Sequence, residues 1–253
     1  MLTLHRAALV LPDPADPTAP SLADGAVLVR GELVEAVGPY AGLAAAHPAA
    51  RVRDWGDALL TPGLRNPYGH WLLERAYHPD PREGAGDEPV PDGLAGERDE
   101  TRCGGSARRG LQRMLGCGVT AVAGPFERAS VRTAVARSGL AVLPGGGADA
   151  GADAGAGVGV GVGAGAGPLD PLAVLPLAEA VHGRVAAGGR ADFAVFAPGG
   201  VFPSQGVQGQ GRVQAPVQGL GRVQGQAQGR PEGAGAGECR ATVLAGRLVF
   251  RRR

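Results

Sequence analysis

Two tracts of biased composition limit how much of this 253-residue chain can fold. Residues 145–167 are almost wholly Gly, Ala and Val, and residues 199–237 are rich in Gly, Gln, Val and Arg, with GRVQ at 211 and again at 221. Segments of this kind bury too little apolar surface to offset the entropy that the backbone loses on ordering. We therefore expect both tracts to be disordered, and the remaining residues to form a core of modest size.

The blocks outside the two tracts predict a mixed α/β fold. Short apolar runs bounded by Pro and Gly indicate strands in the first 64 residues, with a hairpin over residues 25–38 that turns near Arg30 and Gly31. Further on, helical spacing alternates with apolar strand patterns, which is typical of βαβ units with parallel strands. The elements expected there are residues 101–116, 119–123, 129–138 and 140–143. A strand over residues 191–196 and a hairpin over residues 241–250 close the pattern.

Charge and composition exclude several classes of protein. The formal net charge of +1 gives no overall field that would attract nucleic acid or acidic substrates. The sequence contains no lysine, so a bimetallic site bridged by a carboxylated lysine is excluded. No run of about 18 apolar residues and no signal-type N-terminus is present, so we expect a cytoplasmic protein without membrane contact.

The cysteines point to a reducing compartment. Cys103, Cys117 and Cys239 are odd in number and form no CxxC pair, which disfavours a disulfide framework and a structural zinc site. We expect inert thiols in the core.

Five motifs in order resemble the amidohydrolase superfamily, with imidazolonepropionases and aminodeoxyfutalosine deaminases among the relatives. They are DGAVLVRGELVEAVGP at 24–39, LLTPGLRNPYGH at 59–70, GCGVTAVAG at 116–124, GGRADFAVFAP at 188–198 and ATVLAGRLVF at 241–250. The resemblance implies a small composite β-sandwich built from both chain ends and a (β/α) barrel inserted between them. The chain is expected to be a shortened member of this family, because most of the later barrel repeats have no counterpart in it.

The same resemblance divides the chain into parts. It implies that residues 1–61 and 184–253 form the sandwich, with residues 199–237 as a disordered insert. Residues 62–143 correspond to an incomplete barrel fragment, and residues 144–168 form a low-complexity linker to the returning chain.

The metal motif of the family is only partly present. The family carries a His-x-His pair at the end of its first barrel strand, and residues i and i+2 of a strand point to one face. The residues that correspond to this pair and the position between them are Tyr68, Gly69 and His70. His70 is therefore the candidate metal ligand, and Tyr68 replaces the first histidine. A phenol resists the deprotonation that metal binding favours.

None of the other four histidines is expected at the end of a barrel strand. They are His5, His47, His78 and His182. We therefore expect no cofactor, with Zn or Fe bound only if a residual site persists. No catalytic or cofactor-binding residue is assigned.

Each candidate residue can also have a purely structural role. His70 can be a structural histidine, and its grouping with Glu74, His78 and Asp80 can be a chance cluster on a loop. Ser106 lacks the His and Asp pattern of an activated nucleophile. The arginines at 251–253 can be a solvated tail or can bind an acidic surface weakly.

Three functions remain in competition. By resemblance, the chain is a hydrolase acting on non-peptide C–N bonds of cyclic amides or amidines, impaired by its incomplete metal site. Alternatively, it is a non-catalytic accessory or binding protein that forms a homo-oligomer or docks onto a full-length pathway enzyme, because a barrel fragment leaves apolar surface uncovered. The third possibility is a decaying gene product without a retained task.

Overall fold

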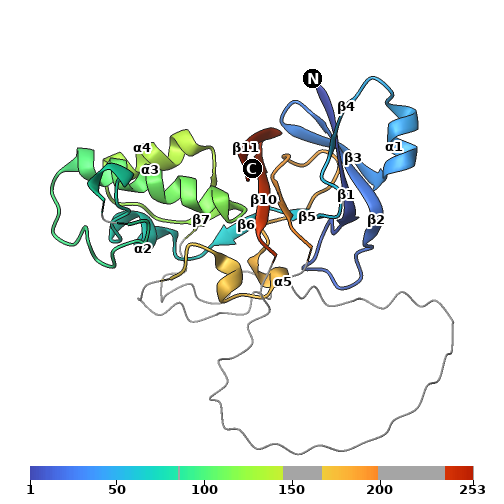
Figure 1. The fold of residues 1–253 in the computed structure, drawn as a ribbon. Helices are drawn as coiled ribbons and strands as arrows, with labels where there is room; N and C mark the ends of the chain where they lie inside the picture. The colour runs from blue at the N-terminus through green and yellow to red at the C-terminus, as the bar shows by residue number, and fades with distance from the viewer. Residues whose placement is uncertain (85, 145–166, 199–236, 253) are drawn as a thin grey trace, which may run out of the picture.

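The computed structural model describes residues 1–84, 86–144, 167–198 and 237–252, and its fold is mixed α/β, as predicted. Strands from both ends of the sequence lie on one side of the molecule, and most of the helices surround a smaller sheet on the other (Figure 1). The two biased tracts fall outside the described residues, except at their last glycines, Gly167 and Gly237. No helix of the described part has both the length and the apolar character needed to span a bilayer.

The larger sheet joins eight strands in the order β11-β10-β9-β5-β1-β2-β3, and β4 pairs with β1 as well. Its strands from the first part of the chain are β1 (Leu2–Val10), β2 (Leu22–Arg30), β3 (Leu33–Pro39), β4 (Arg51–Asp54) and β5 (Leu59–Pro62). Its strands from the last part are β9 (Phe193–Phe196), β10 (Cys239–Leu244) and β11 (Arg247–Arg251). The hairpin expected near Arg30 and Gly31 is the β2–β3 connection, with Gly31 at a φ of 62° that favours glycine.

The two ends of the sequence are joined by β5 and β9. These strands are antiparallel, and Leu59 lies opposite Phe196 while Leu60 lies opposite Val195. Strand β1 serves both parts, because its first half pairs with β4 and its last two residues pair with β5. The sheet therefore runs without a break from the N-terminal hairpin to the C-terminal hairpin.

Alternation along β9 and β10 divides their side chains between two cores. Phe193, Val195 and Val243 face an apolar interior that they share with strands β1, β2 and β5. Their neighbours Ala194, Phe196 and Leu244 point the other way, into the core of the helical part. Because successive residues of a strand face opposite sides, β9 and β10 connect the larger sheet, called the composite sheet from here on, with the helical part around the smaller sheet.

Helix α1 (Tyr40–Ala46) covers the remaining face of the N-terminal strands. Leu4, Ala26 and Leu28 are buried beneath Tyr40 and Leu43. This packing buries β1 and β2 on both faces.

The smaller sheet consists of three parallel strands in the order β6-β7-β8. They are β6 (Leu64–Asn66), β7 (Val119–Ala123) and β8 (Ala141–Leu143), and the helices are α2 (Gly69–Glu74), α3 (Glu100–Gly116), α4 (Ala129–Ser138) and α5 (Leu177–Ala180). Two single 3-10 turns, Pro81–Glu83 and Pro171–Ala173, complete this part. Asp99 caps the start of α3, where its carboxylate accepts a hydrogen bond from the Thr101 amide at 2.8 Å. Gly139, with a φ of 77°, caps the end of α4.

Candidate functional site

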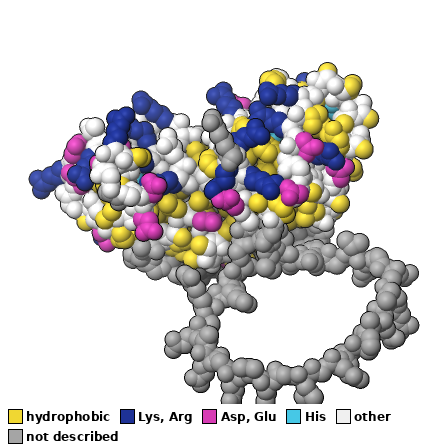
Figure 2. Space-filling model, viewed as in Figure 1, with side chains coloured by type: hydrophobic (Ala, Val, Ile, Leu, Met, Phe, Trp, Pro, Cys, Tyr) yellow, Lys and Arg dark blue, Asp and Glu magenta, His cyan; other side chains and the backbone are white. Residues whose placement is uncertain are grey.

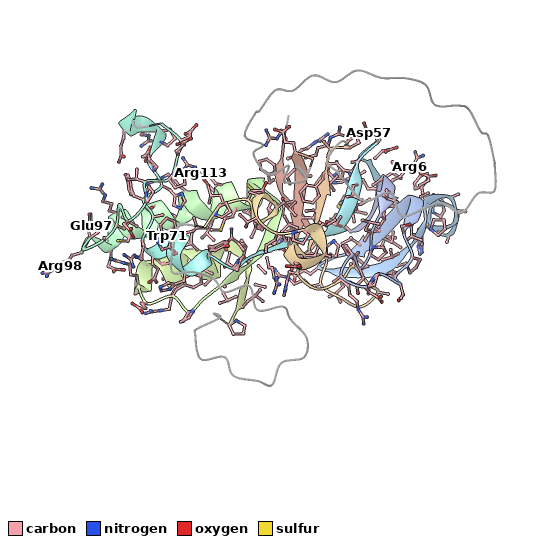
Figure 3. All side chains as sticks on the ribbon, turned by 90° about the horizontal axis from the view of Figure 1, so that it is seen from below. Arg6, Asp57, Trp71, Glu97, Arg98 and Arg113 are labelled. Carbon is pink, nitrogen blue, oxygen red and sulfur yellow. The ribbon has the colours of Figure 1, made fainter. Side chains whose placement is uncertain are left out.

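The carboxyl ends of β6 and β7 form the place where a parallel sheet of this kind carries its chemistry. Asn66 ends β6, and the residues Gly124 and Pro125 follow β7. Helix α2, which carries His70, starts directly after the end of β6. In Figure 3, the neighbouring residue Trp71 lies on the helical side of the molecule, away from Arg6 and Asp57 of the composite sheet.

The prediction that Tyr68 and His70 share one face of a strand is wrong. Strand β6 stops at Asn66, Tyr68 precedes the first helical residue, and His70 lies in the first turn of α2. The side-chain oxygen of Asn66 accepts a hydrogen bond from the Tyr68 amide at 2.8 Å, which turns the chain out of the strand. Pro67 has no amide proton to continue the ladder. Local turn chemistry thus overrides the strand pattern.

The ring of His70 is nevertheless held in an orientation suited to a metal ligand. Its Nδ1 lies 2.7 Å from the carbonyl oxygen of Pro125, so Nδ1 carries the proton and donates. In a neutral ring this arrangement leaves the lone pair on Nε2, and a backbone carbonyl on the opposite nitrogen is the usual support of metal-bound histidines. The side chain is half-buried. The role of His70 as a ligand stays a prediction.

The neighbouring candidates do not join His70. Glu74 is buried, and its carboxylate accepts a hydrogen bond from the Arg128 amide at 2.9 Å. His78 is fully buried and donates from Nε2 to the Leu72 carbonyl at 2.9 Å, while burial lowers its pKa. Asp80 accepts from the Arg82 amide at 3.0 Å at the start of a 3-10 turn. Each side chain therefore serves the local fold.

A complete metal site is not formed by the described residues. Among them, no three His, Cys, Asp or Glu side chains lie close enough together to hold an ion. Catalytic zinc takes three protein ligands and leaves one position open. A single oriented imidazole does not meet this requirement.

The returning chain lies across the end of β6. Asn66 is fully buried, and its Nδ2 donates to the carbonyls of Pro168 at 3.0 Å and Leu169 at 3.1 Å. Gly167 lies so close to the ring of Tyr68 that a Cβ atom built on it would come within 1.9 Å of Cγ. The face of Tyr68 is thus covered by backbone. Residues 167–169 therefore fill the space beside the carboxyl end of β6.

The remaining histidines belong to structural sites. His5 lies in β1 against Trp55 and Phe193, and burial, followed by the positive charge of Arg53, lowers its pKa to about 3. His47 ends α1. The backbone of His182 donates to the Gly63 carbonyl at 2.7 Å, and burial lowers the pKa of the ring.

Ser106 and the three cysteines are equally unsuited to nucleophilic chemistry. The buried hydroxyl of Ser106 accepts from the His78 amide at 2.9 Å and has no imidazole partner. Burial raises the pKa of Cys103, raises that of Cys117 to about 12 and raises that of Cys239 to about 11. These thiols stay protonated near neutral pH, and only a thiolate is an effective nucleophile.

Asn66 is the residue of this site whose role sequence reasoning missed. Its three hydrogen bonds connect the end of β6 to the start of α2 and to the returning chain. The one available signal is that it is the only asparagine of the sequence and precedes a proline, a pair typical of turns.

Comparison with known proteins finds matches to two short stretches of the chain. Residues 25–50, which cover most of the β2–β3 hairpin and α1, match the family described as "Imidazolonepropionase-like composite domain, bacteria". A 50-residue stretch is 40% identical to an imidazolonepropionase of Pyrobaculum arsenaticum. These two matches confirm the resemblance to imidazolonepropionase-like proteins of the amidohydrolase superfamily. The stretch covers 20% of this chain and only 13% of that relative.

Solved structures of several deaminases align with larger parts of the chain. Guanine deaminase from Bradyrhizobium japonicum is 19% identical, with a TM-score of 0.41 over 56% of this chain and 34% of the enzyme. E. coli guanine deaminase is 17% identical, with a TM-score of 0.42 over 56% and 35%. An adenosine deaminase from Xanthomonas campestris with bound zinc is 24% identical, with a TM-score of 0.38 over 56% and 33%. The chain thus spans about a third of the length of these enzymes.

Proposed function

We propose that this chain is an amidohydrolase-type protein, related to imidazolonepropionases, whose hydrolysis of non-peptide C–N bonds in cyclic amides or amidines is impaired. The observation that carries the proposal is the state of His70. Its imidazole is anchored at Pro125 with Nε2 available, yet no further ligands accompany it among the described residues. In this proposal the three parallel strands are a fragment of the family's barrel, and residues 1–61 and 184–253 form its composite sandwich.

Metal content and activity of the purified protein test the proposal together. We expect fewer than about 0.1 Zn or Fe ions per chain by mass spectrometry, because one imidazole does not retain a divalent ion through purification. Imidazolone propionate, which the name of the Pyrobaculum relative implies as substrate, should show no ring opening by ultraviolet absorbance. About one tightly bound ion per chain, together with turnover that His70→Ala abolishes and His47→Ala preserves, would refute the proposal.

A second function, a non-catalytic accessory protein that associates with itself, is favoured by the edge of the smaller sheet. Among the described strands, β8 is at the edge of this sheet, and the Val142 side chain on it is 55% exposed. The central strand β7 is buried at all five residues. An open edge with an apolar side chain is a ready template for pairing with another strand.

The oligomeric state of matched variants tests this second function. Light scattering should show a dimer for the natural sequence and a monomer for Val142→Arg. Val249→Arg, which charges an exposed valine on β11, should remain dimeric. A natural protein that is strictly monomeric at concentrations near 100 micromolar, an order-of-magnitude choice for weak association, would exclude self-association through β8.

A further inference from the structure

A groove with a basic lining lies between α3 and β11, at the other end of β7 from His70. Gly116 and Cys117, which line it, precede β7, whereas Pro125 beside His70 follows that strand. The groove is shallow and open to solvent, with a volume of about 550 Å³. We call it the α3–β11 groove, and its lining includes Arg109, Gln112, Arg113, Gly116, Phe250 and Arg252. Figure 2 shows dark-blue basic side chains on the face that includes β11 and α3.

The lining combines two segments that are far apart in the sequence. The residues from α3 are spaced at i, i+3, i+4 and i+7, which places them on one face of the helix. Phe250 lies in β11, and Arg252 directly follows that strand. The Phe250 ring lies beside Gly116, where a Cβ atom built on the glycine would be 3.5 Å from Cε2 of the ring. The groove therefore has an aromatic floor beside three guanidinium groups.

Arg113 is the cation of this groove with the least compensation. Its Nη1 is buried and has no hydrogen-bond partner among the described residues. Its Nη2 lies 3.6 Å from a carboxylate oxygen of Asp87, whose side chain is 92% exposed. A loose pair with a fully solvated carboxylate contributes little. A guanidinium whose carboxylate partner is loosely held can exchange it for an anion in the groove, because hydrogen bonds between a guanidinium and an anion are among the stronger ones. Figure 3 shows Arg113 on the helical side of the molecule.

The other two arginines are held in place by backbone carbonyls. Nε of Arg109 donates to the His78 carbonyl at 2.8 Å, and Nε of Arg252 donates to the Cys239 carbonyl at 3.4 Å. Each also pairs with one carboxylate, Arg109 with Asp80 at 3.5 Å and Arg252 with Glu238. Neither carboxylate is among the residues that line the groove. The described residues of the lining thus include three cations and no anion.

We propose that the α3–β11 groove binds a small organic anion that carries a carboxylate or phosphate on an apolar body. The anionic group would accept hydrogen bonds from Arg113, with Arg109 and Arg252 beside it. The apolar body would lie on Phe250 and Gly116. Guanidinium forks suit both carboxylate and phosphate oxygens, and the aromatic floor favours a ring or a short hydrocarbon chain over a bare inorganic ion.

Titration of the intact chain with three matched probes tests this site. Benzoate, phenyl phosphate and the uncharged benzyl alcohol share the ring and differ in the charged group. At least one of the two anions should bind at least about tenfold more tightly than benzyl alcohol by calorimetry, as expected for a charge-assisted pair. The tighter of the two identifies the anionic group. Anion binding no stronger than that of benzyl alcohol would overturn the proposal.

Variants on the same helix locate the binding. Arg113→Gln should weaken the anion that binds at least about tenfold. Arg108→Gln removes an exposed arginine of α3 that does not line the groove and should bind like the natural protein. If Arg113→Gln fails to fold by circular dichroism, Arg252→Gln, at a more exposed position, replaces it and should show a clear loss. Equal losses in the control and in the groove variants would overturn the assignment.

Discussion

His5 offers the sharpest test of how burial of an ionisable group controls the stability of the composite sheet. The residue is 2% exposed, and its ring centroid lies 4.9 Å from that of Phe193. Its Nδ1 has no hydrogen-bond partner in the part of the chain that the structure describes. Burial lowers its pKa from 6.5 to about 3, so the folded protein holds the neutral form. Below the ordinary pKa the unfolded chain binds a proton that the folded chain does not. Stability therefore falls as the pH drops from about 6.5 towards 3.

The size of this effect follows from the two pKa values. Near pH 5, proton binding to His5 in the unfolded chain lowers the free energy of unfolding by about 2 kcal/mol. Near pH 7 the same effect is only about 0.2 kcal/mol. His5→Phe keeps an aromatic ring against Phe193 and removes the titration. The free energy of unfolding from urea titration should therefore fall between about pH 7 and pH 5 by roughly 2 kcal/mol less in His5→Phe than in the natural protein.

A matched histidine variant provides the control. His47→Gln replaces a histidine at the end of α1, outside the apolar core, and should keep the acid sensitivity of the natural protein. The reasoning is refuted if His5→Phe loses as much stability on acidification as the natural protein does.

Three further substitutions and one control probe the packing of the described core, each measured by urea unfolding with circular dichroism. Gly110→Ala places a Cβ 2.6 Å from Nε2 of the buried His78 and should lower the free energy of unfolding by about 1–3 kcal/mol. In the control, Gly42→Ala in α1, the new Cβ meets no atom within 4 Å and should raise it by about 0.5–1 kcal/mol. Equal effects of the two substitutions would contradict the packing around His78. Asn66→Ala removes three hydrogen bonds from a buried side chain and should cost about 2–4 kcal/mol; a loss below about 0.5 kcal/mol would show that this link is unimportant. Phe193→Ala empties a fully buried position and should cost about 3–5 kcal/mol, and a neutral result would mean that β9 does not form the shared core.

The sequence alone was sufficient for most of the elements, because their signals are local. The apolar runs on either side of Gly31 predict the β2–β3 hairpin, and the helical spacing before Gly116 predicts α3. The ordered motifs also led to the family resemblance that the match over residues 25–50 confirms. Each of these inferences rests on residues within one turn, strand or helix.

The tertiary structure decided where chemistry-bearing side chains lie, because those positions depend on contacts between distant segments. The strand pattern placed His70 beside Tyr68, but the Asn66 turn moved it into a helix and against Pro125. Likewise, Arg113 and Arg252 line one groove only because β11 packs along α3. Periodicity specifies which face of an element is apolar, whereas the partner of that face is selected by packing of the whole chain.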